Sequence, residues 1–304
     1  MTPLFDHRQV GRAFSRAAAH YDEAAALQRE VGERLAESLP YYEDAALGAR
    51  RPQVVLDVGC GTGHATAMLQ ARWPKAQVIG FDLAPGMVRE SQRRLHVRRG
   101  LLDFARRPHV LRADALALPL REASVDVIFS NLCLQWIEDL PAVFAGFRRV
   151  LRPDGLLLVS TFGQQTLVEL HEAFAAADAA PHVSPFVDIA RFGDVLIAAG
   201  FRDPVLDRDV FHAGYADLPS LMRELRTLGA TNAMQDRRRA LTGRARFARA
   251  SEAYEAFRRP DGVLPATWEV IYAQAWGPAP GAPIRHAGVD EVRVPASQIP
   301  VRRR

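Results

Sequence analysis

The segment Val54-Val-Leu-Asp-Val-Gly-Cys-Gly-Thr-Gly63 runs from an apolar, β-branched stretch directly into three glycines. A helical pattern follows from His64 to Trp73, and Pro74 ends it. In open α/β sheets, ligands bind where a strand turns into a helix in this way. The free amides at the start of the helix favour a carboxylate or a phosphate. We therefore expect a ligand site at this turn.

The spacing of the glycines argues against a dinucleotide. The dinucleotide fingerprint G-x-G-x-x-G would require a glycine at position 64, where the chain has His64. The pattern here is D-x-G-x-G-x-G, with Asp57 two residues before Gly59. Two further aspartates follow predicted strands. Asp82 lies 25 residues after Asp57, where it could accept ribose hydroxyls, and Asp114 is placed to meet an adenine amino group.

Short apolar strands alternate with helices on both sides of this segment. Such alternation predicts a parallel sheet that is covered on both faces. The predicted strands are Val54–Val58, Gln77–Asp82, His109–Leu111, Val125–Ser130 and Leu156–Thr161, the last entered through a turn at Pro153–Gly155, and the helices between them are His64–Trp73, Pro85–Arg99 and Pro141–Leu151.

Outside this region, strands and helices no longer alternate regularly in the predicted pattern. Apolar residues at helical spacing predict a helix through the first forty residues, which Pro40 ends. After Thr161 the sequence predicts helices over Asp188–Ala199, Asp217–Leu228 and Thr242–Arg258, and a capping box at Thr166–Glu169 that opens another. We expect one domain over 1–276, made of a helical segment (1–40), a ligand-binding core (53–161), helical insertions with one returning strand (163–262) and a last strand (263–276), followed by a flexible, proline-rich tail (277–304).

Composition excludes several classes of protein. Hydrophobic residues make up 48% and charged residues 24% of the 304-residue chain, as in globular proteins. No apolar run approaches the ~18 residues of a membrane span. Cys60 and Cys133 are too few for a disulfide framework, and the histidines lack metal-ligand spacing, so we expect a cytoplasmic protein without a metal. The net charge of +4 is dispersed, which argues against a nucleic-acid partner.

The segment from Val54 to about Thr161 resembles the S-adenosylmethionine site of class I methyltransferases. The resemblance implies an α/β fold with a Rossmann-like seven-stranded sheet, helices on both faces and a helical cap insertion, and S-adenosylmethionine as the cofactor. It assigns the methionine portion to the turn of Asp57, Gly59, Gly61 and Gly63 with Asn131 and Leu132 beneath it, the ribose to Asp82, and the adenine to Met87, Asp114 and Ala115.

The flanking segments resemble the malonyl-carrier-protein O-methyltransferases of biotin synthesis. The likeness runs from about Phe5 to Trp276. It implies methylation of the free carboxylate of a malonyl thioester on acyl-carrier protein or coenzyme A, with S-adenosylhomocysteine as the product. The similar segments are Val10–Phe14, Ala19–Asp22, Ala26–Gln28, Ser130–Trp136, Ser160–Gly163, Leu221–Asn232 and Leu241–Gly243.

A malonyl carboxylate needs positioning rather than activation. A carboxyl group with a pKa near ~4 is already anionic at neutral pH, so no general base is required. An arginine suits a buried carboxylate because its planar fork matches the two oxygens. We expect Arg223 to hold the malonyl carboxylate, with Arg226 as the alternative. We expect the side chain of Tyr21 to close over the site. Gln135 should line the pocket, and Trp136 should pack in the core.

The charge of the insertion suggests where an acidic carrier protein would dock. Residues 213–262 hold ten arginines against six acidic residues, including Arg237–Arg239, Arg244, Arg246 and Arg249. We expect this basic surface to receive the carrier and guide its arm inward, and the enzyme to act as a monomer. Two alternatives stay open: a methyltransferase for another small free carboxylic acid, and a methyltransferase-fold assembly or hydroxylation factor that transfers no methyl group.

Overall fold

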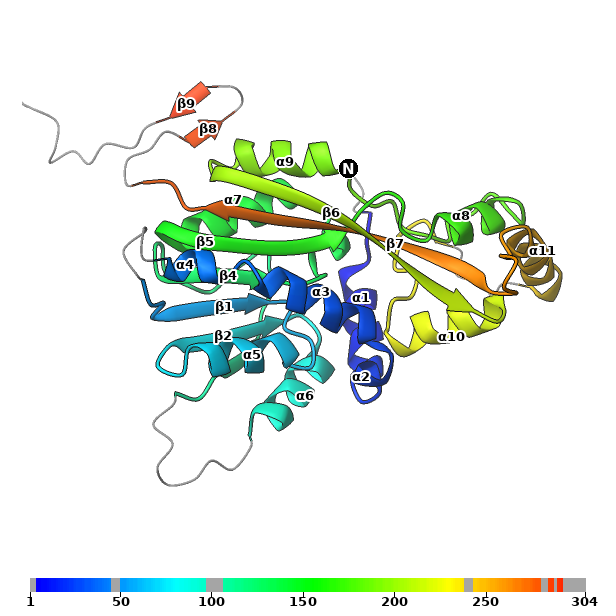
Figure 1. Ribbon diagram of the computed structural model, residues 1–304, viewed down its shortest axis with the longest axis horizontal. Coiled ribbons are helices and arrows are strands. Elements are labelled where there is room, and N and C mark those ends of the chain that lie inside the picture. Colours follow the sequence, from blue (N-terminus) through cyan, green and yellow to red (C-terminus); the bar gives the residue numbers. More distant parts are fainter. Residues whose placement is uncertain are drawn as a thin grey trace, which may run out of the picture.

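The computed structural model describes residues 4–44, 50–96, 106–237, 243–279, 284–286 and 289–291. Its centre is a seven-stranded sheet in the order β3-β2-β1-β4-β5-β7-β6 (Figure 1). Strands β1 to β5 pair in parallel, and β7 runs antiparallel to both β5 and β6. The predicted fold class is confirmed. The strands are β1 (Val54–Val58), β2 (Gln77–Asp82), β3 (His109–Arg112), β4 (Val125–Ser130), β5 (Leu151–Phe162), β6 (Arg202–Tyr215) and β7 (Leu264–Trp276).

Helices cover both faces of the sheet because successive strand residues point to opposite sides. Leu56 and Ile128 pack with α7 and α9 on one face, while Val55 and Val127 pack with α3, α4 and α5 on the other. All four side chains are fully buried. The helices are α1 (His7–Ala17), α2 (Tyr21–Ala24), α3 (Ala26–Ala36), α4 (Pro40–Glu43), α5 (His64–Arg72), α6 (Pro85–Leu95), α7 (Leu140–Val150), α8 (Val168–Ala175), α9 (Ile189–Ala198), α10 (Leu218–Thr227) and α11 (Arg244–Glu255), with a 3₁₀ turn at Leu134–Trp136.

Strands β6 and β7 extend past the rest of the sheet and carry a cap (Figure 1). The far ends of these two strands pack against α8, α10 and α11 in one apolar cluster, which includes Phe174, Leu221 and Trp268. The hydroxyl of Tyr254 in α11 donates to the carbonyl of Pro265 in β7, 2.7 Å away. The structure therefore has the predicted helical cap insertion, and β6 lies between its helices α9 and α10 in the sequence. Within the described residues, no helix has both the length and the apolar character that crossing a membrane requires.

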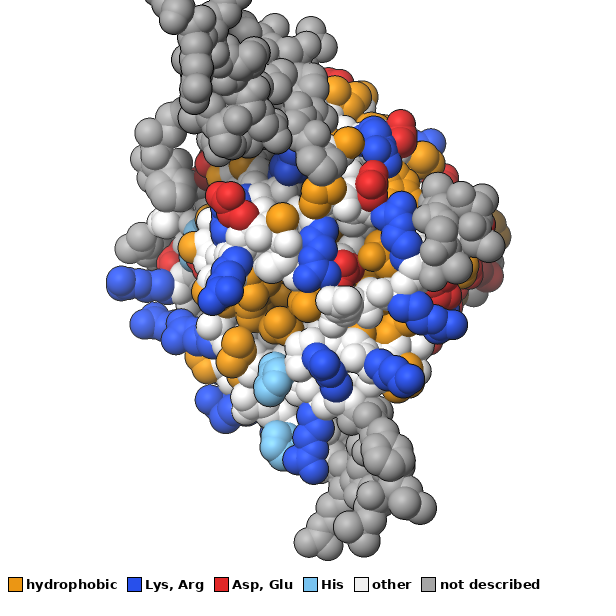
Figure 2. Space-filling view, turned by 90° about the vertical axis from the view of Figure 1, so that its left-hand side faces the viewer, with side chains coloured by type: hydrophobic (Ala, Val, Ile, Leu, Met, Phe, Trp, Pro, Cys, Tyr) orange, Lys and Arg blue, Asp and Glu red, His pale blue; other side chains and the backbone are white. Residues whose placement is uncertain are grey.

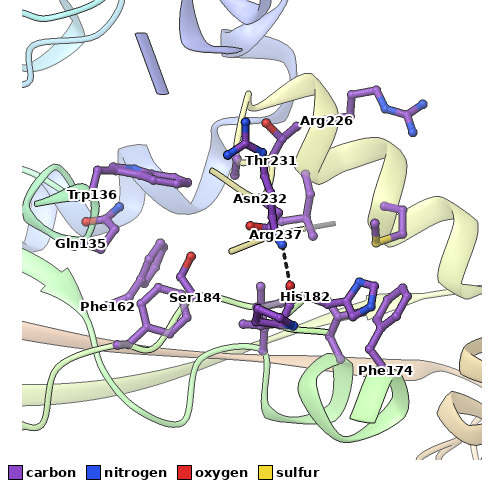
Figure 3. A pocket seen from close by; sticks show the side chains of 18 of the residues that line it. Gln135, Trp136, Phe162, Phe174, His182, Ser184, Arg226, Thr231, Asn232 and Arg237 are labelled. Atoms are coloured by element: carbon purple, nitrogen blue, oxygen red, sulfur yellow. Dashed lines mark hydrogen bonds between the residues drawn. The ribbon is translucent and has the colours of Figure 1, made fainter. Parts of the chain in front are cut away.

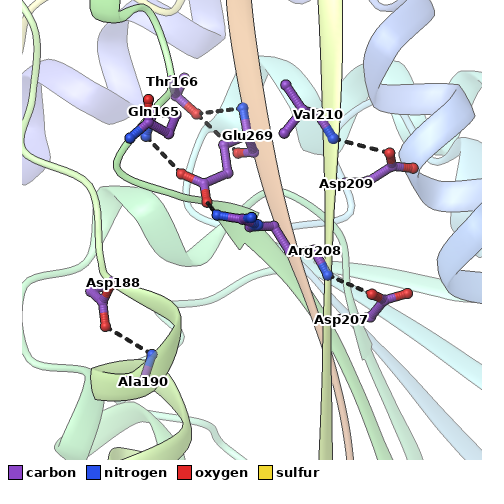
Figure 4. Close-up of polar contacts among 9 residues, drawn as sticks. All are labelled: Gln165, Thr166, Asp188, Ala190, Asp207, Arg208, Asp209, Val210 and Glu269. Carbon is purple, nitrogen blue, oxygen red and sulfur yellow. Dashed lines mark hydrogen bonds and ion pairs between the residues drawn. The ribbon is translucent and has the colours of Figure 1, made fainter.

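A buried carboxylate fixes the turn between β5 and α8 to the sheet. Glu269 of β7 is 5% exposed. Its Oε2 accepts a hydrogen bond from the Gln165 amide at 2.7 Å, and its Oε1 lies 3.3 Å from Nη1 of Arg208 in β6 (Figure 4). The hydroxyl of Thr166 donates to the Glu269 carbonyl and accepts from the Glu269 amide. The insertion thus begins at a turn that Glu269 of β7 holds, and Arg208 of β6 pairs with the same glutamate.

The capping box predicted at Thr166–Glu169 is wrong. Thr166 is engaged with β7 as described, and the carboxylate of Glu169 accepts hydrogen bonds from the amide and hydroxyl of Thr267. Helix α8 instead begins after Leu167, whose φ of 56° is left-handed. Both side chains that could cap the helix are taken because β7 offers them buried backbone partners.

The N-terminal segment also differs from its prediction, since it forms four helices rather than one. Asp6 caps α1 by accepting from the Gln9 amide at 3.1 Å. The breaks after Ala17 and Ala24 let α1 pack on α6 while α3 packs on β5. Pro40 begins α4 instead of ending a helix, because proline at the first helical position lacks only an amide that the helix does not use.

Two more local features differ from expectation. The predicted turn at Pro153–Gly155 lies inside β5, where the pairing with β4 shifts register between Val125 and Val127. In the tail, Ile284–His286 (β8) and Val289–Glu291 (β9) form an antiparallel pair that the lack of periodicity did not predict. The other tail residues after Ala279 lie outside the described residues.

Candidate active site

Three glycines shape the turn after β1, and all have positive φ values, of 75° at Gly59, 54° at Gly61 and 83° at Gly63. A Cβ on Gly59 would lie 2.4 Å from Cys133 Sγ, and one on Gly63 would lie 2.3 Å from Ser91 Oγ. Gly61 differs, because a Cβ there would meet nothing within 4 Å. Close packing therefore requires Gly59 and Gly63, whereas Gly61 borders open space.

Asp82, at the end of β2, orders this turn. Its Oδ2 accepts from the Gly61 amide at 2.9 Å, and its Oδ1 accepts from the Ala84 amide at 2.8 Å. Burial raises the pKa of Asp82 to about 6, although the two amides oppose the shift. An ionised carboxylate has about four acceptor positions, so Asp82 can accept further hydrogen bonds from a ligand.

Asp57, in β1, is almost fully buried beside the same turn. It is 1% exposed, and its Oδ2 accepts from the Thr66 hydroxyl at 2.6 Å. Burial raises the pKa of Asp57 to about 7, the Thr66 hydrogen bond opposes this, and the charge of Asp82 adds to it. Two buried carboxylates therefore lie near the carboxyl ends of the neighbouring strands β1 and β2.

One cavity brings most of the predicted cofactor residues together. A smaller neighbouring cavity shares Tyr21, Gly59, Gly61 and Asn131 with it and adds Asp57. Gly63 lines neither cavity and instead precedes α5 as its N-cap. The predicted residues that line the first cavity are Tyr21, Gly59, Gly61, Asp82, Met87, Asp114, Ala115, Asn131 and Leu132.

The floor of the cofactor cavity is held from β5. The hydroxyl of Ser160 donates to Asn131 Oδ1 at 2.8 Å and accepts from the Leu132 amide at 3.0 Å. The Asn131 amide group donates to the Gln28 carbonyl at 2.8 Å. Leu132 has a φ of 46°, a left-handed conformation that persists only where its surroundings enforce it. Ser160 therefore fixes two predicted cofactor residues without lining the cavity.

Helix α2 contributes Tyr21 to the wall of the cavity and is hydrogen-bonded to the glycine turn. Asp22 accepts from the Thr62 hydroxyl at 2.7 Å and forms an ion pair with Arg94 of α6. Arg94 Nε also donates to the Thr62 carbonyl at 2.9 Å. Tyr21, next to Asp22, lines both cofactor cavities. Burial raises the pKa of Tyr21 well above its usual value, so its hydroxyl stays protonated.

A second, larger cavity of about 360 Å³ lies between the carboxyl ends of the strands and the cap (Figure 3). Trp136 lines this cavity and the cofactor cavity alike. Aromatic and aliphatic side chains form most of its wall. Its apolar lining residues are Trp136, Phe162, Leu167, Leu170, Phe174, Pro181, Val183, Phe186, Met222, Leu225, Ala230 and Trp268.

The structure separates the candidate arginines. Arg223 is exposed on α10 and does not line the second cavity, so the structure does not bring it to the site. Arg226 lines the cavity but is exposed. Arg237 also lines it, and only 18% of its side chain is exposed. Its Nη1 donates to the Met234 carbonyl at 2.7 Å, and its Nη2 lies 3.4 Å from Asp6 Oδ2.

Sequence reasoning missed several residues of both cavities. His7, Val10, Gly11 and Phe14 of α1 line the cofactor cavity. The apolar spacing of α1 was visible, but an apolar stripe alone does not distinguish a core from a ligand cavity. Trp136 both packs, with its ring 5.3 Å from that of Phe14, and lines the two cavities. Packing alone is therefore an incomplete interpretation of Trp136.

The basic surface expected on the insertion is less uniform than its sequence. Arg238 and Arg239 lie outside the described residues. Arg249 donates to the Ala177 carbonyl at 2.8 Å, and Arg246 lies 3.6 Å from Asp178, so both hold the loop after α8. Basic side chains are also spread over the opposite end of the molecule, where the parallel strands begin (Figure 2). Charge alone therefore does not select the cap as a docking surface.

The comparisons with known proteins agree with this geometry. A family model described as "Methyltransferase domain" matches residues 56–159. The fold resembles the YcgJ protein of Bacillus subtilis, with a TM-score of 0.53 at 16% identity over 80% of this chain and 97% of that one. It also resembles the BH2331 protein of Bacillus halodurans, with a TM-score of 0.54 at 18% identity over 81% of this chain and 99% of that one.

Curated relatives match almost the whole chain. A malonyl-[acyl-carrier protein] O-methyltransferase of Xylella fastidiosa is 54% identical over all of this chain and 99% of its own length. The enzyme of the same name from Halorhodospira halophila is 44% identical over 98% of this chain and 97% of its own length. Because these matches include the cap and the N-terminal helices as well as the sheet, the chain belongs to the malonyl-[acyl-carrier protein] O-methyltransferase family.

Proposed function

We propose that this enzyme transfers a methyl group from S-adenosylmethionine to the free carboxyl group of a malonyl thioester on acyl-carrier protein, an early step of biotin synthesis. One observation carries the proposal: the cavity at the glycine turn, which Asp82 and Asp114 line, and the larger cavity under the cap share a wall residue, Trp136. The methyl donor in the first cavity and the acyl acceptor in the second would thus lie next to each other beside Trp136. The family relationship supports the same reaction.

The residues of the first cavity fit S-adenosylmethionine. The open side of Gly61 leaves room against the main chain, and Asp82 keeps acceptor positions for ribose hydroxyls. Met87 and Ala115 offer apolar contacts for an adenine, with Asp114 beside them. Tyr21, Asp57 and Asn131 would surround the methionine portion. When bound, the cofactor supplies a methyl group activated by a positive sulfur.

The acceptor requires orientation and the exclusion of water. A carboxylate is anionic at neutral pH, so the enzyme has no proton to remove. Holding one oxygen toward the donor can account for much of the rate enhancement. The apolar part of the second cavity's wall, with Phe162 and Trp268, would help to exclude water once the acceptor fills the cavity.

Arg237 is our candidate for the carboxylate anchor, in place of the predicted Arg223. It is the more buried of the two cavity-lining arginines, and an ion pair gains strength where solvent is excluded. Its partial pairing with Asp6 would moderate its grip on the substrate and leave one carboxylate oxygen reactive. Arg226, exposed at the rim of the cavity, suits the phosphate of a carrier arm, and Arg223 lies one turn earlier on α10.

The test is a labelled-methyl assay with malonyl-carrier protein, malonyl-coenzyme A, succinyl-coenzyme A and free malonate. We expect the malonyl thioesters to be methylated and free malonate to react at least ~100-fold more slowly, since it lacks the arm that fills the cavity. Turnover of free malonate as fast as the thioesters would contradict the proposal. So would tight binding of S-adenosylmethionine without methyl transfer to any thioester.

The anchor is tested by paired variants. Arg237→Gln should lower kcat/KM for malonyl-carrier protein by roughly 100-fold, because it removes a charge-assisted hydrogen bond from a partly buried site. Arg223→Gln changes the net charge equally on the exposed face of α10 and should alter kcat/KM by less than about threefold. The reverse ranking of the two variants would return the role to Arg223.

A further inference from the structure

Two polar atoms in the wall of the second cavity are buried and lack hydrogen-bond partners. They are Gln135 Oε1 and Thr231 Oγ1, and neither has a partner within the described residues. Both residues line the cavity of about 360 Å³ (Figure 3). Buried polar groups are nearly always satisfied, so two unpaired ones in a single cavity indicate a ligand that completes them.

The orientation of the Gln135 amide group is determined by a neighbour. Its Nε2 donates to the Leu132 carbonyl at 2.7 Å. A flipped amide would place two oxygens against each other, so Oε1 must face away from Leu132. Gln135 therefore presents an acceptor, and that acceptor requires an N–H or O–H donor from a ligand.

Thr231 is held just as firmly on the other segment of the cavity wall. Thr231 follows the end of α10, where the Ala230 amide donates to the Leu225 carbonyl at 2.9 Å. The Thr231 amide donates to the Gly229 carbonyl at 2.8 Å. The next residue, Asn232, donates from Nδ2 to the Pro181 carbonyl at 2.7 Å (Figure 3). The backbone around the Thr231 hydroxyl is thus anchored to both α10 and the loop after α8.

The reacting end of the substrate cannot be the partner of Gln135, although it could accept a hydrogen bond from the Thr231 hydroxyl. An ionised malonyl carboxylate and a thioester carbonyl only accept hydrogen bonds, so neither can satisfy Gln135 Oε1. A pantetheine arm carries two secondary amides, each with an N–H donor and a carbonyl acceptor. We infer that Gln135 and Thr231 bind the amide groups of that arm, which makes them determinants of thioester specificity. This inference rests on the proposed function, and it extends that function from the malonyl unit to the arm.

The rest of the cavity is compatible with such an arm. Between Gln135 and Thr231 the wall consists mainly of apolar side chains, including Phe162 and Leu225, which suit the methylene groups of pantetheine. Exposed Arg226 at the rim suits the phosphate that joins the arm to a carrier protein or to coenzyme A. An ionised free dicarboxylic acid could accept from the Thr231 hydroxyl but would leave Gln135 Oε1 unpaired, at a cost in affinity.

The inference is tested by binding rather than by turnover. Calorimetry with S-adenosylhomocysteine-loaded protein would compare malonyl-pantetheine with two analogues, in each of which one amide N–H is replaced by an ester oxygen. The protein variants are Gln135→Met and Thr231→Val, with Thr231→Ser as a matched control that keeps the hydroxyl. Affinity for S-adenosylhomocysteine and the melting temperature report whether each variant remains folded.

We expect the analogue that lacks the N–H group facing Gln135 to bind wild-type protein roughly tenfold more weakly than malonyl-pantetheine. The reason is that Gln135 Oε1 is a buried acceptor and would lose its donor. In Gln135→Met the same replacement should cost less than about twofold, since the acceptor is already gone. Thr231→Val should weaken binding of malonyl-pantetheine, and Thr231→Ser should largely restore it.

Three outcomes would overturn the inference. These are equal binding of the amide and both ester analogues to wild-type protein, an ester penalty that is unchanged in Gln135→Met, and no binding of malonyl-pantetheine at all. The proposed function is judged separately by methyl transfer to malonyl-carrier protein. If the enzyme methylates malonyl-carrier protein but binds the amide and ester analogues equally well, the proposed function stands. Only the role of Gln135 and Thr231 in binding the arm is then rejected.

Discussion

Gly59 and Gly61 show how two identical residues in one turn can have different roles. Gly59 is packed against Cys133, so its missing side chain serves the fold. Gly61 has no neighbour within 4 Å of an added Cβ, so its missing side chain serves whatever occupies the cavity. Both have positive φ values, which means that backbone strain is common to both substitutions.

The first prediction compares these two glycines. Gly61→Ala should lower the affinity for S-adenosylhomocysteine at least ~10-fold while costing only about 1 kcal/mol of stability for the left-handed backbone. Gly59→Ala adds an overlap of its Cβ with Cys133 Sγ and should lower the melting temperature considerably more. Calorimetric titration and thermal unfolding of both variants check this. Equal losses of stability, or unchanged affinity in Gly61→Ala, would contradict it.

A second prediction follows from the raised pKa of Asp57. Its pKa is about 7 in the folded protein against 3.8 for a free side chain. Between these values the folded protein binds more protons than the unfolded chain, so the free energy of unfolding falls as pH rises. The cost is complete above about pH 7 and absent below about pH 4.

Asp57→Asn should remove this cost, on the order of 2–4 kcal/mol at pH 8, while the oxygen of the new amide side chain can still accept from the Thr66 hydroxyl. Unfolding by urea from pH 5 to pH 8 should therefore show a steeper loss of stability for wild type than for the variant. Affinity for the cofactor should fall at the same time, because Asp57 lines the smaller cofactor cavity. Parallel pH profiles for the two proteins would show that Asp57 is not the group responsible.

At the scale of helices and strands, the elements that the sequence predicted correctly are those defined by local chemistry. Strands β1 and β4 are buried on both faces and are mostly apolar, with Asp57 in β1 and Asp126 and Ser130 in β4 as the polar exceptions. Helices α9 and α10 begin after Asp188 and Asp217, whose side chains accept from helix amides. Each of the two helices is followed by a glycine of positive φ.

The elements that the sequence did not locate are defined by distant partners. Strand β6 is at the edge of the sheet, and its charged residues, such as Asp207 and Arg208, hide the alternation that predicts a strand. The capping box failed because Thr267 and Glu269, about a hundred residues away, take the capping side chains. Neither effect can be seen within a short window of sequence.

The same contrast explains the two cavities. Most of the predicted cofactor residues lie near the carboxyl ends of β1, β2, β3 and β4, so short-range patterns predicted their positions and the structure brings most of them together. The second cavity combines residues from Gln135 to Trp268, contributed by the 3₁₀ turn after β4, by β5 and β7, and by the cap helices and their loops. Arg237 could not be distinguished from Arg223 by sequence, because burial separates the two and burial is a tertiary property.

At the scale of the whole molecule, the N-terminal segment and the cap form one connected lid. The Asp6 amide donates to the Ala233 carbonyl, and the Gln235 amide donates to the Leu4 carbonyl, both at 2.8 Å. Phe5 and Met234 form a β-bridge between these segments. Helix α1 lines the cofactor cavity, and the segment after α10 lines the second cavity. Ordering one cavity should therefore help to order the other.

Phe5 offers a test of this coupling, because it lines neither cavity but packs against Trp136, which lines both. It is 3% exposed, and its ring centre lies 6.2 Å from that of Trp136. Phe5→Ala should weaken the binding of S-adenosylhomocysteine and of malonyl-carrier protein together, by roughly fivefold or more, the usual size of coupling between sites. Val143→Ala, in the core of α7, should lower the melting temperature without changing either affinity. If Phe5→Ala also lowered only the melting temperature, the contact between Phe5 and Trp136 would not couple the two cavities.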